Sequence, residues 1–373
     1  MRNLGKLAVL GITALGLALA GPQDNSLVIG ASQEPRVLAG DFLSVISNQA
    51  IKSEIEQYLF APFIGFNADS QNFPVLATEV PTLENGRLRV TDIGGGKKRL
   101  EMDITIRPDA KWSDGRPITT EDVAFYFEVG KAKGMPVLNP DFWERVNVRI
   151  KDARNFTLIF EPAYYYDTYG PINTYAPKHI MGPEWERVKA AARGLDHQKD
   201  AEKLNELYRN FFIKFSTPQA LNRGAMVYSG PFMLRRWVPG NSIEMVRNPN
   251  FPIKPEGGES KYVQKVVYRF IQNTNSLLVA VIGGSIDATS SVSLTFDQGR
   301  SPQLVRRAPG RFDIWFVPGA IWEHIDINKF ENCQVVKDLG LNDKRTRQAI
   351  LHALNREGLV KAFFDGLQPV AHT

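Results

Sequence analysis

The clearest hydrophobic pattern in the first third of the chain is that of β-strands. Residues 27–31, Leu-Val-Ile-Gly-Ala, form an apolar run that ends at the polar loop 33–35, so they predict a buried first strand. Apolar and polar residues alternate along residues 100–107, and the glycines at 94–96 separate this segment from residues 87–91. Alternation with a period of two is typical of a half-buried strand, so the two segments predict an antiparallel hairpin.

Helical patterns occur at four places. Residues 51–59 predict a helix after the first loop. Thr-Thr-Glu-Asp at 119–122 predicts a helix start, because a threonine oxygen caps free amides and acidic residues suit the positive end of the dipole. The stretch from 182 to 222 is rich in Lys, Glu and Ala, so we expect surface helices there. Apolar residues at helical spacing predict one helix over 343–364, with Gly366 at its C-terminal cap.

A strand–helix–strand pattern lies between these segments. Residues 263–271 predict a buried strand, residues 276–282 a short apolar helix, and residues 286–288 the start of another strand. Two strands joined by a helix over so short a distance form a βαβ unit, which implies a parallel sheet packed by helices. The fold class is therefore predicted to be α/β.

The N-terminus has the pattern of a secretory signal. Arg2 and Lys6 precede the apolar stretch 7–20, which ends in Ala-Leu-Ala and predicts cleavage before Gly21. The alternative is an uncleaved membrane anchor, but a spanning helix needs about 20 apolar residues. No cysteine follows the predicted cut, so we expect no lipid anchor and a protein free in the periplasm.

The charge pattern does not point to a nucleic-acid partner. The formal net charge is +5, to which Arg2 and Lys6 contribute, and the basic residues are dispersed. The densest basic cluster, residues 97–99, lies in the predicted hairpin turn, where charged side chains are solvated. We therefore expect no nucleic acid among the partners.

The composition favours a large protein with more than one lobe. A chain of 373 residues with 43% hydrophobic residues can build two or three lobes. The single cysteine, Cys333, excludes an internal disulfide, so stability outside the cytoplasm must come from core burial. We expect Cys333 to be packed or incidental rather than a nucleophile.

Motifs for catalysis and metal binding are missing from the sequence. Ser285 lacks the second glycine of a Gly-x-Ser-x-Gly motif, and residues 94–97 lack the upstream glycine of a phosphate-binding loop. The five histidines are isolated from one another, and no cysteine pair is present. We therefore expect no cofactor, no metal site and no enzyme.

Aromatic residues are the positive signal for ligand binding. Aromatic rings line clefts that hold extended or amphipathic ligands, although each ring has core packing as its alternative role. Trp112, beside the Ser-Asp-Gly turn at 113–115, is expected to be structural. The other residues considered are Tyr164, Tyr165, Tyr166, Tyr169, Tyr175, Phe142, Trp143, Tyr228, Trp237, Trp315 and Trp322.

One segment resembles a known family. Residues 104–123, Ile-Thr-Ile-Arg-Pro-Asp-Ala-Lys-Trp-Ser-Asp-Gly-Arg-Pro-Ile-Thr-Thr-Glu-Asp-Val, resemble the signature of family 5 extracellular solute-binding proteins. These are the peptide-binding, and sometimes nickel- or sugar-binding, receptors of ABC importers. Collinear similarities extend over nearly all of residues 25–373. They are residues 73–79, 228–234, 239–251, 283–287 and 345–357.

The resemblance implies a periplasmic-binding-protein-like fold of the class II type. Its two lobes would close by hinge motion on a ligand between them, and a small subdomain would decorate the first lobe. The implied divisions are a signal peptide over 1–20, a first lobe over 21–66 and 177–318, a small α/β subdomain over 67–176, and the start of the second lobe over 319–373.

The sequence differs from this family in the extent of its second lobe. In the family that lobe runs on for well over a hundred residues, whereas here one strand, one loop and one helix precede Thr373. So small a lobe would leave sheet edges and an apolar helix face exposed, so we expect a truncated fragment. The acid that pairs with a peptide's α-amino group would lie in the missing part.

The implied function is that of a periplasmic receptor that binds a peptide-like solute in the cleft and delivers it to an inner-membrane ABC permease. We expect a monomer, and nickel is a weaker expectation than peptide because no histidine cluster is present. The alternatives are a secreted α/β hydrolase or lectin, or a truncated fragment that binds nothing. The predicted ligand-binding residues are Gln33, Glu34, Phe142, Trp143, Tyr228, Ser229, Trp322 and His324.

Overall fold

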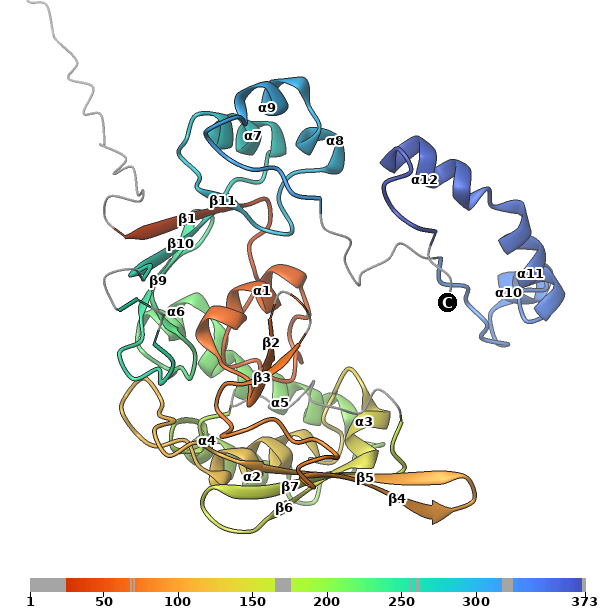
Figure 1. The fold of residues 1–373 in the computed structure, drawn as a ribbon. Helices are drawn as coiled ribbons and strands as arrows, with labels where there is room; N and C mark the ends of the chain where they lie inside the picture. Colours follow the sequence, from red (N-terminus) through yellow and green to blue (C-terminus); the bar gives the residue numbers. More distant parts are fainter. Residues whose placement is uncertain are drawn as a thin grey trace, which may run out of the picture. The chain divides into compact units, whose positions relative to one another are not determined.

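The computed structural model describes residues 25–67, 69, 71–164, 176–254, 257–258, 262–316 and 325–370. The predicted signal segment and the predicted ligand-binding residues Trp322 and His324 lie outside these ranges. The chain divides between Leu294 and Thr295 into two compact units, which are described separately (Figure 1). No helix within the described ranges combines the length and the apolar composition that crossing a membrane requires.

The first unit contains a five-stranded sheet assembled from distant parts of the chain. Its strands are β1 (Ser26–Ala31), β8 (Phe232–Val238), β9 (Ser242–Arg247), β10 (Lys265–Phe270) and β11 (Ala288–Thr289), in the order β11-β1-β10-β9-β8. β1 pairs in parallel with both β10 and β11, whereas β9 is antiparallel to β10 and to β8. The predicted parallel pairing is confirmed for three strands.

Helix α7 (Thr274–Ile282) connects β10 to β11 on the other side of β1, which confirms the predicted strand–helix–strand unit. Its Leu277 packs with Val28 of β1 and with Ile286 in a small buried cluster. Gly30 permits this close approach, because a Cβ at that position would lie 2.6 Å from Leu277 Cδ1. A larger side chain at Gly30 would force the helix away from the sheet.

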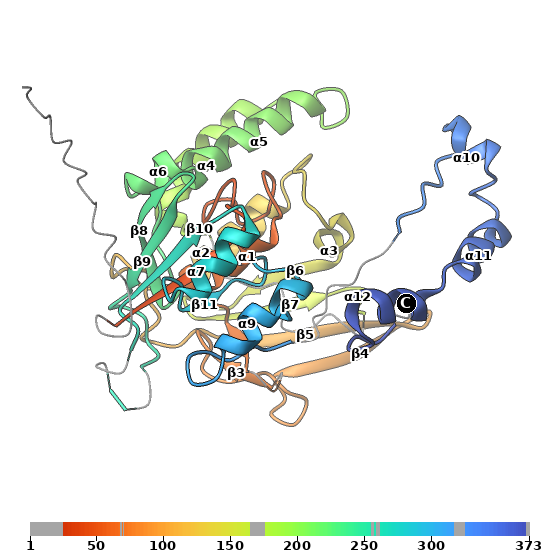
Figure 2. The ribbon, with the colours of Figure 1, turned by 90° about the horizontal axis from the view of Figure 1, so that it is seen from above.

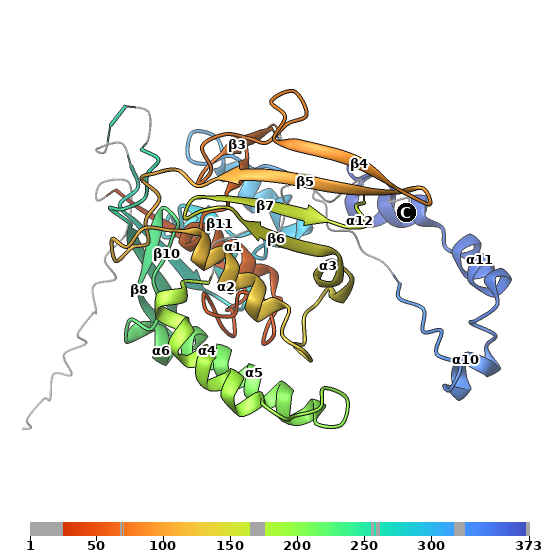
Figure 3. The same cartoon turned by 90° about the horizontal axis from the view of Figure 1, so that it is seen from below.

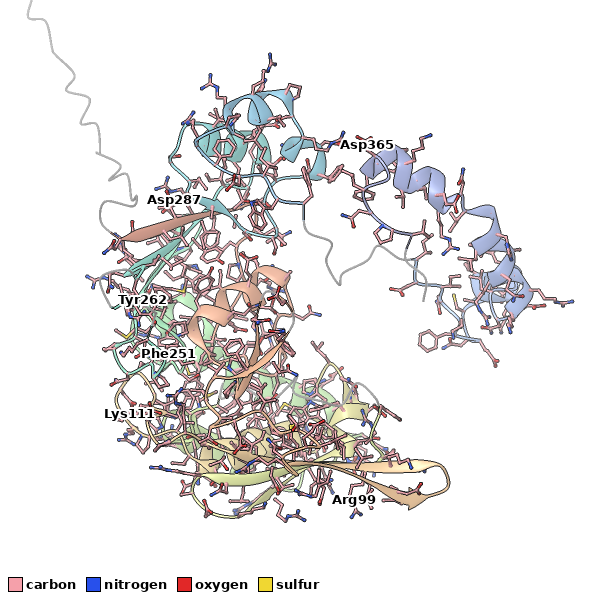
Figure 4. The ribbon with its side chains drawn as sticks, in the orientation of Figure 1. Arg99, Lys111, Phe251, Tyr262, Asp287 and Asp365 are labelled. Carbon is pink, nitrogen blue, oxygen red and sulfur yellow. The ribbon has the colours of Figure 1, made fainter. Side chains whose placement is uncertain are left out.

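Asp287 fixes β11 beside β1. The Val28 amide donates a hydrogen bond to Asp287 Oδ2 at 2.8 Å, and the Asp287 amide donates to the Val28 carbonyl at 2.9 Å (Figure 4 labels Asp287). Both bonds join the same two residues, directly before the paired residues Ile29 and Ala288, so they anchor the start of β11 beside β1. The Gly-Gly-Ser-Ile-Asp segment at 283–287 therefore has a structural role at the end of α7.

A four-stranded antiparallel sheet also belongs to the first unit (Figure 3). Gly95 and Gly96 form its hairpin turn with positive φ values of 60° and 73°. This hairpin, β4 with β5, was predicted from the alternating pattern and is confirmed. In the order β4-β5-β7-β6, the strands are β4 (Leu88–Gly94), β5 (Lys97–Thr105), β7 (Asn155–Phe160) and β6 (Val146–Ile150).

Most helices of the first unit lie at predicted positions, but the helix over Pro140–Arg145 was not predicted. Thr119 caps α2 through a side-chain oxygen that accepts from the Glu121 amide, and Asp122 accepts from the Thr119 amide in return. This capping box confirms the predicted helix start. The helices are α1 (Ala50–Leu59), α2 (Thr120–Gly130), α3 (Pro140–Arg145), α4 (Lys178–Ala192), α5 (Ala201–Ser216) and α6 (Pro218–Asn222), and a short ribbon pairs β2 (Ile64–Phe66) with β3 (Asn72–Pro74).

Helices α4 and α5 lie side by side, as Figure 2 shows. The predicted helical character of this region is confirmed, but the expectation of surface helices was incomplete. Trp185 of α4 packs against Tyr208 and Phe211 of α5, with ring centroids 6.0 Å and 5.2 Å apart. All three rings belong to the main buried core, because each helix is amphipathic and turns one face inward.

The second unit contains only short helices within its described residues. The prediction of a single helix over 343–364 was wrong, because the first helix of this segment ends at Ala353 and a second one begins at Arg356. The Asn355 side chain accepts a hydrogen bond from the Gly358 amide at 2.9 Å and so caps a new helix. The helices are α8 (Phe296–Gly299), α9 (Pro302–Arg307), α10 (Gln334–Asp338), α11 (Lys344–Ala353) and α12 (Arg356–Phe364).

Candidate ligand-binding site

The parallel strands place three loops at one edge of the five-stranded sheet. β1, β10 and β11 run in the same direction, so the segments that follow them leave the sheet at its carboxyl edge. In open α/β sheets, ligands bind outside the carboxyl ends of the parallel strands. We refer to residues 32–34, 271–273 and 290–293 as the carboxyl-edge loops.

Each carboxyl-edge loop exposes a polar side chain. Gln33 follows β1, Gln272 follows β10 and Ser291 follows β11, and all three are exposed. Side-chain amides and hydroxyls both donate and accept hydrogen bonds, as a peptide main chain requires of its binding surface. The loops therefore offer uncharged hydrogen-bonding groups from three separate strands.

Glu54 of α1 organises the loop that follows β11. Its Oε2 accepts hydrogen bonds from Ser290 Oγ at 2.9 Å and from the Ser291 amide at 3.0 Å, and Ser291 Oγ also donates to it. Its Oε1 accepts from the hydroxyl of Tyr268 on β10 at 2.8 Å. One carboxylate thus joins a helix, a strand and a loop that are far apart in sequence.

Two tyrosines support this carboxylate. Burial raises the pKa of Tyr268 far above its usual value, and the nearby Tyr58 and Glu54 raise it further. Burial likewise raises the pKa of Tyr58, whose ring centroid lies 5.9 Å from that of Tyr268. Tyr268 therefore stays protonated and keeps donating to Glu54.

The loop after β11 is also bonded to the loop after β1. The Ser32 amide and hydroxyl donate to the Val292 carbonyl at 3.1 Å and 2.7 Å. Within the loop, the Val292 amide donates to Ser290 Oγ at 3.2 Å. With the Glu54 contacts, these bonds hold residues 290–293 from both sides, so this surface is preorganised.

Glu34, a predicted ligand-binding residue, is bonded to the scaffold. Its Oε1 accepts from the Trp237 indole nitrogen and its Oε2 from the Gly240 amide, each at 2.8 Å. Both partners belong to the β8–β9 hairpin, so Glu34 ties the first loop to the antiparallel half of the sheet. Its neighbour Gln33 is the residue of the predicted pair that faces solvent.

Phe142 and Trp143 lie on α3, beside the four-stranded sheet. Their rings contact each other with centroids 5.3 Å apart, and Trp143 also packs 5.4 Å from Tyr126 and 5.8 Å from Phe127 of α2. A Cβ on Gly130 would overlap the Trp143 ring. Trp143 is therefore locked against α2, and both residues are half-buried.

Tyr228 and Ser229 are buried in the first unit. The Ser113 amide donates to the Tyr228 carbonyl at 2.8 Å, and the Tyr228 amide donates to Ser113 Oγ at 3.0 Å. The Ala61 amide donates to Ser229 Oγ at 3.2 Å, and burial raises the pKa of Tyr228. These contacts hold the predicted Trp-Ser-Asp-Gly turn, in which Trp112 is fully buried as expected.

The predicted ligand-binding residues that the structure describes thus lie in three separate places. Gln33 and Glu34 belong to the carboxyl-edge loops, Phe142 and Trp143 to α3, and Tyr228 and Ser229 to the buried segment beside the Trp-Ser-Asp-Gly turn. Glu54, Tyr268, Gln272 and Ser291 were not predicted from the sequence as residues of the candidate site. The predicted βαβ unit could have indicated Gln272 and Ser291 as candidate ligand-binding residues, since both follow parallel strands. Glu54 lies in the middle of a helix and has no comparable signal.

A separate cavity of about 540 Å³ lies between α2 and α4. Its polar side chains already have partners, since Lys178 Nζ lies 3.1 Å from Glu121 and His179 Nε2 lies 2.9 Å from Asp114. Among the described residues, no group of three or more His, Cys, Asp or Glu side chains is arranged to hold a metal ion. The carboxyl-edge loops remain the stronger candidate.

Comparison with known proteins assigns the family. The model of the bacterial extracellular solute-binding proteins, family 5 (middle region), matches residues 97–373. The chain therefore belongs to family 5 of the bacterial extracellular solute-binding proteins, and the resemblance found in its motifs is confirmed. The Thermus thermophilus and Bacillus subtilis relatives named below are oligopeptide-binding proteins.

Solved structures confirm the α/β, periplasmic-binding-protein-like fold. An oligopeptide-binding protein of Thermus thermophilus, complexed with a pentapeptide, is 98% identical with a TM-score of 0.87, and the match covers 94% of this chain and 58% of that chain. NikZ of Campylobacter jejuni, in complex with Ni(L-His), is 17% identical with a TM-score of 0.59, and the match covers 92% of this chain and 56% of that chain. The second likeness concerns the fold alone.

Curated relatives have longer chains. The oligopeptide-binding protein AppA of Bacillus subtilis (strain 168) is 23% identical over 369 residues, which are 94% of this chain and 53% of AppA. The chain thus spans about half the length of the curated relatives it matches.

Proposed function

We propose that this chain is the peptide-binding component of an ABC importer that works in the periplasm and delivers its ligand to an inner-membrane permease. The observation that carries the proposal is the 98% identity to an oligopeptide-binding protein complexed with a pentapeptide. At that identity, nearly every side chain of the matched surface is the same. Export through the signal predicted over residues 1–20 agrees with membership of an extracellular family.

The carboxyl-edge loops supply the chemistry for this role. Gln33, Gln272 and Ser291 offer hydrogen-bonding groups without charge, which suits a main chain whose side chains vary. The network around Glu54 holds the third loop before any ligand arrives, so little conformational entropy is lost on binding. The proposed role requires binding and release without turnover.

Isothermal titration calorimetry with a defined set of pentapeptides tests this function. We expect saturable binding of at least one pentapeptide, and recovery of that peptide with unchanged mass after incubation. Free amino acids and a nickel–histidine mixture are the matched ligand controls. Cleavage of the peptide would establish a hydrolase, and absence of binding by every pentapeptide would contradict the proposal.

A further inference from the structure

The chain between β1 and α1, residues 36–49, forms a closed loop, which we call the connecting segment. Gln49 Oε1 accepts hydrogen bonds from the Arg36 amide at 2.8 Å and from Ser47 Oγ at 2.9 Å, so the two ends of the segment are joined. The segment links the first carboxyl-edge loop to α1, the helix whose Glu54 holds the loop after β11. It therefore lies between two parts of the candidate site along the chain.

Two residues of the connecting segment have left-handed backbone conformations without being glycine. Ala39 has a φ of 58° and Ser44 a φ of 55°. A strained conformation of this kind costs about 1–3 kcal/mol, so it persists only where the surroundings hold it. The Ala39 amide donates to Glu56 Oε1 at 2.8 Å, and Lys52 Nζ donates to Ser44 Oγ at 3.4 Å. Side chains of α1 thus hold both strained positions.

The charged groups that hold the segment are buried and do not balance. Asp41 is fully buried, and Lys52 and Glu56 have 2% and 4% of their surface exposed. Lys52 Nζ lies 3.1 Å from Glu56 Oε2 and donates to the Asp41 carbonyl at 3.0 Å. One ammonium is therefore shared by two buried carboxyl groups, and a buried charge without a partner is costly. One of the two carboxyls is expected to keep its proton to a much higher pH than an exposed carboxyl does.

Glu56 is the carboxyl that keeps its proton. Burial raises the pKa of Glu56 to about 7, Lys52 opposes the shift, and the charge of Asp41 adds to it. The Asp41 carboxylate accepts hydrogen bonds from the Ile46 amide at 3.2 Å and from the Ser47 amide at 3.1 Å, which favour its ionised form. Ionisation of Glu56 then places a second negative charge beside a single lysine.

The other elements packed on the segment contribute no competing titration near neutral pH. At the end of α5, the Ser216 carbonyl accepts from the Leu38 amide at 3.0 Å. From α2, the Tyr126 ring lies 5.4 Å from that of Phe42, and burial raises the pKa of Tyr126 far above its usual value. Within the segment, Arg36 is exposed to solvent. The charge of the cluster is therefore set by Asp41, Lys52 and Glu56.

We propose that Asp41, Lys52 and Glu56 form a proton-operated latch, which keeps the connecting segment closed on α1 while Glu56 is protonated and lets it open when Glu56 is ionised. Opening exposes the Glu56 carboxylate to water and releases the strain at Ala39. The population of the open form therefore rises with pH. This latch belongs to the first unit and does not depend on which solute is bound.

Native-state hydrogen exchange tests the latch. The full chain is exchanged at pH 5 and at pH 8, and mass spectrometry follows the fragment over 36–49, with rates corrected for the intrinsic effect of pH on amide exchange. The ordinary carboxyl pKa of 4.5 in the open form and the raised value of about 7 in the closed form make opening about 70-fold more favourable at pH 8. We expect the protection of the hydrogen-bonded amides of the segment to fall by about this factor.

The amides of β7 distinguish local opening from global unfolding. Phe156, Thr157 and Leu158 of this strand are fully buried, so their amides report on unfolding of the whole unit. We expect the connecting segment to be less protected than β7, and its exchange to be unaffected by low urea concentrations that accelerate exchange in β7. Equal protection of the two segments would show that no separate opening exists and would overturn the proposal.

Two substitutions assign the effect to the cluster. Glu56→Gln keeps an acceptor for the Ala39 amide and removes the titrating proton, so the fall in protection between pH 5 and pH 8 should disappear. Asp41→Asn leaves Glu56 as the single carboxylate beside Lys52, so the fall should become smaller. Arg36→Gln changes an exposed charge of the same segment and is the control, with the fall unchanged. Circular dichroism checks that each variant is folded.

Two further results would overturn the proposal. The wild-type connecting segment could have the same protection at pH 5 and pH 8. The fall could also persist unaltered in both Glu56→Gln and Asp41→Asn, which would assign it to another group. Exchange is measured without added peptide, so a failure of the latch and a failure of peptide binding give separate results.

Discussion

Glu54 accepts hydrogen bonds from both the backbone amide and the hydroxyl of Ser291, although the two residues are separated by 237 positions in the sequence. The contact joins α1 to the loop that leaves the parallel part of the sheet. The contact also places a carboxylate whose two oxygens both accept hydrogen bonds next to Ser291, an exposed residue of the candidate site. The shape of that loop therefore depends on one side chain from a distant helix.

Removal of Glu54 should loosen the candidate site. Glu54→Ala leaves three donors of the 290–291 segment and the Tyr268 hydroxyl without their acceptor, so we expect a loss of about 1–3 kcal/mol in unfolding free energy. We also expect at least about tenfold weaker pentapeptide binding. Glu54→Gln keeps one acceptor and should be milder. Urea denaturation and calorimetry measure the two effects.

The control for this prediction is Ser53→Ala on the same helix, because Ser53 is exposed. Wild-type affinity in Glu54→Ala, together with the expected loss of stability, would show that the loop after β11 does not contact the ligand.

Substitutions at the neighbouring residues Gln33 and Glu34 should have different effects, one on peptide binding and the other on the free energy of unfolding. Glu34→Ala removes the acceptor of the buried Trp237 indole and of the Gly240 amide, so we expect a loss of about 1–3 kcal/mol in unfolding free energy. Gln33→Ala removes an exposed side chain and should leave the unfolding transition unchanged while weakening peptide binding. Tryptophan fluorescence during urea denaturation follows the first effect, and calorimetry follows the second. Equal effects of both substitutions on stability would contradict this division of roles.

Helices and strands could be predicted from the sequence where the residues that determine each element are close together in the chain. The alternation along β5 and the capping residues at 119–122 predict their elements because the causes lie within a few residues. The break after Ala353 was missed because the apolar spacing continues through it, and Asn355 resembles any polar position on a helix surface until its side chain is seen to cap the Gly358 amide.

The candidate site was less predictable than the fold. Gln33 and Glu34 were predicted as ligand-binding residues from their position after the first strand. Their different contacts depend on the β8–β9 hairpin, which begins about 200 residues later. Trp143 was predicted to bind ligand as an aromatic residue, and the structure places it against α2. Contacts between residues far apart in sequence leave no periodic signal, so residue type alone could not separate these roles.

Gly130 and Trp143 should behave as a coupled pair. Gly130→Ala at the end of a helix would ordinarily add up to about 1 kcal/mol of stability. Here the added Cβ overlaps the Trp143 ring, so we expect a loss of about 1–3 kcal/mol instead. In a Trp143→Ala background the same substitution should be neutral or stabilising. A double-mutant cycle from urea denaturation gives the coupling energy, and additive effects would argue against the contact.

The buried group of Asp41, Lys52 and Glu56 should make stability depend on pH. Lys52 Nζ lies 3.1 Å from Glu56 Oε2 and donates to the Asp41 carbonyl at 3.0 Å. Burial raises the pKa of Glu56 to about 7, although Lys52 opposes the shift, and burial raises the pKa of Asp41 as well. A carboxyl whose pKa is higher in the folded protein binds more protons when folded than when unfolded.

The stability from these carboxyls is therefore fully present below their unfolded pKa values and falls as pH rises. For Glu56 the loss runs from the usual glutamate range, about pH 4.5, to about pH 7, with a slope of at most about 1.4 kcal/mol per pH unit. Urea denaturation at closely spaced pH values over this window measures the slope. Glu56→Gln should flatten it, whereas exposed Gln57→Glu on the same helix should not. A wild-type slope retained in Glu56→Gln would assign the pH dependence to another group.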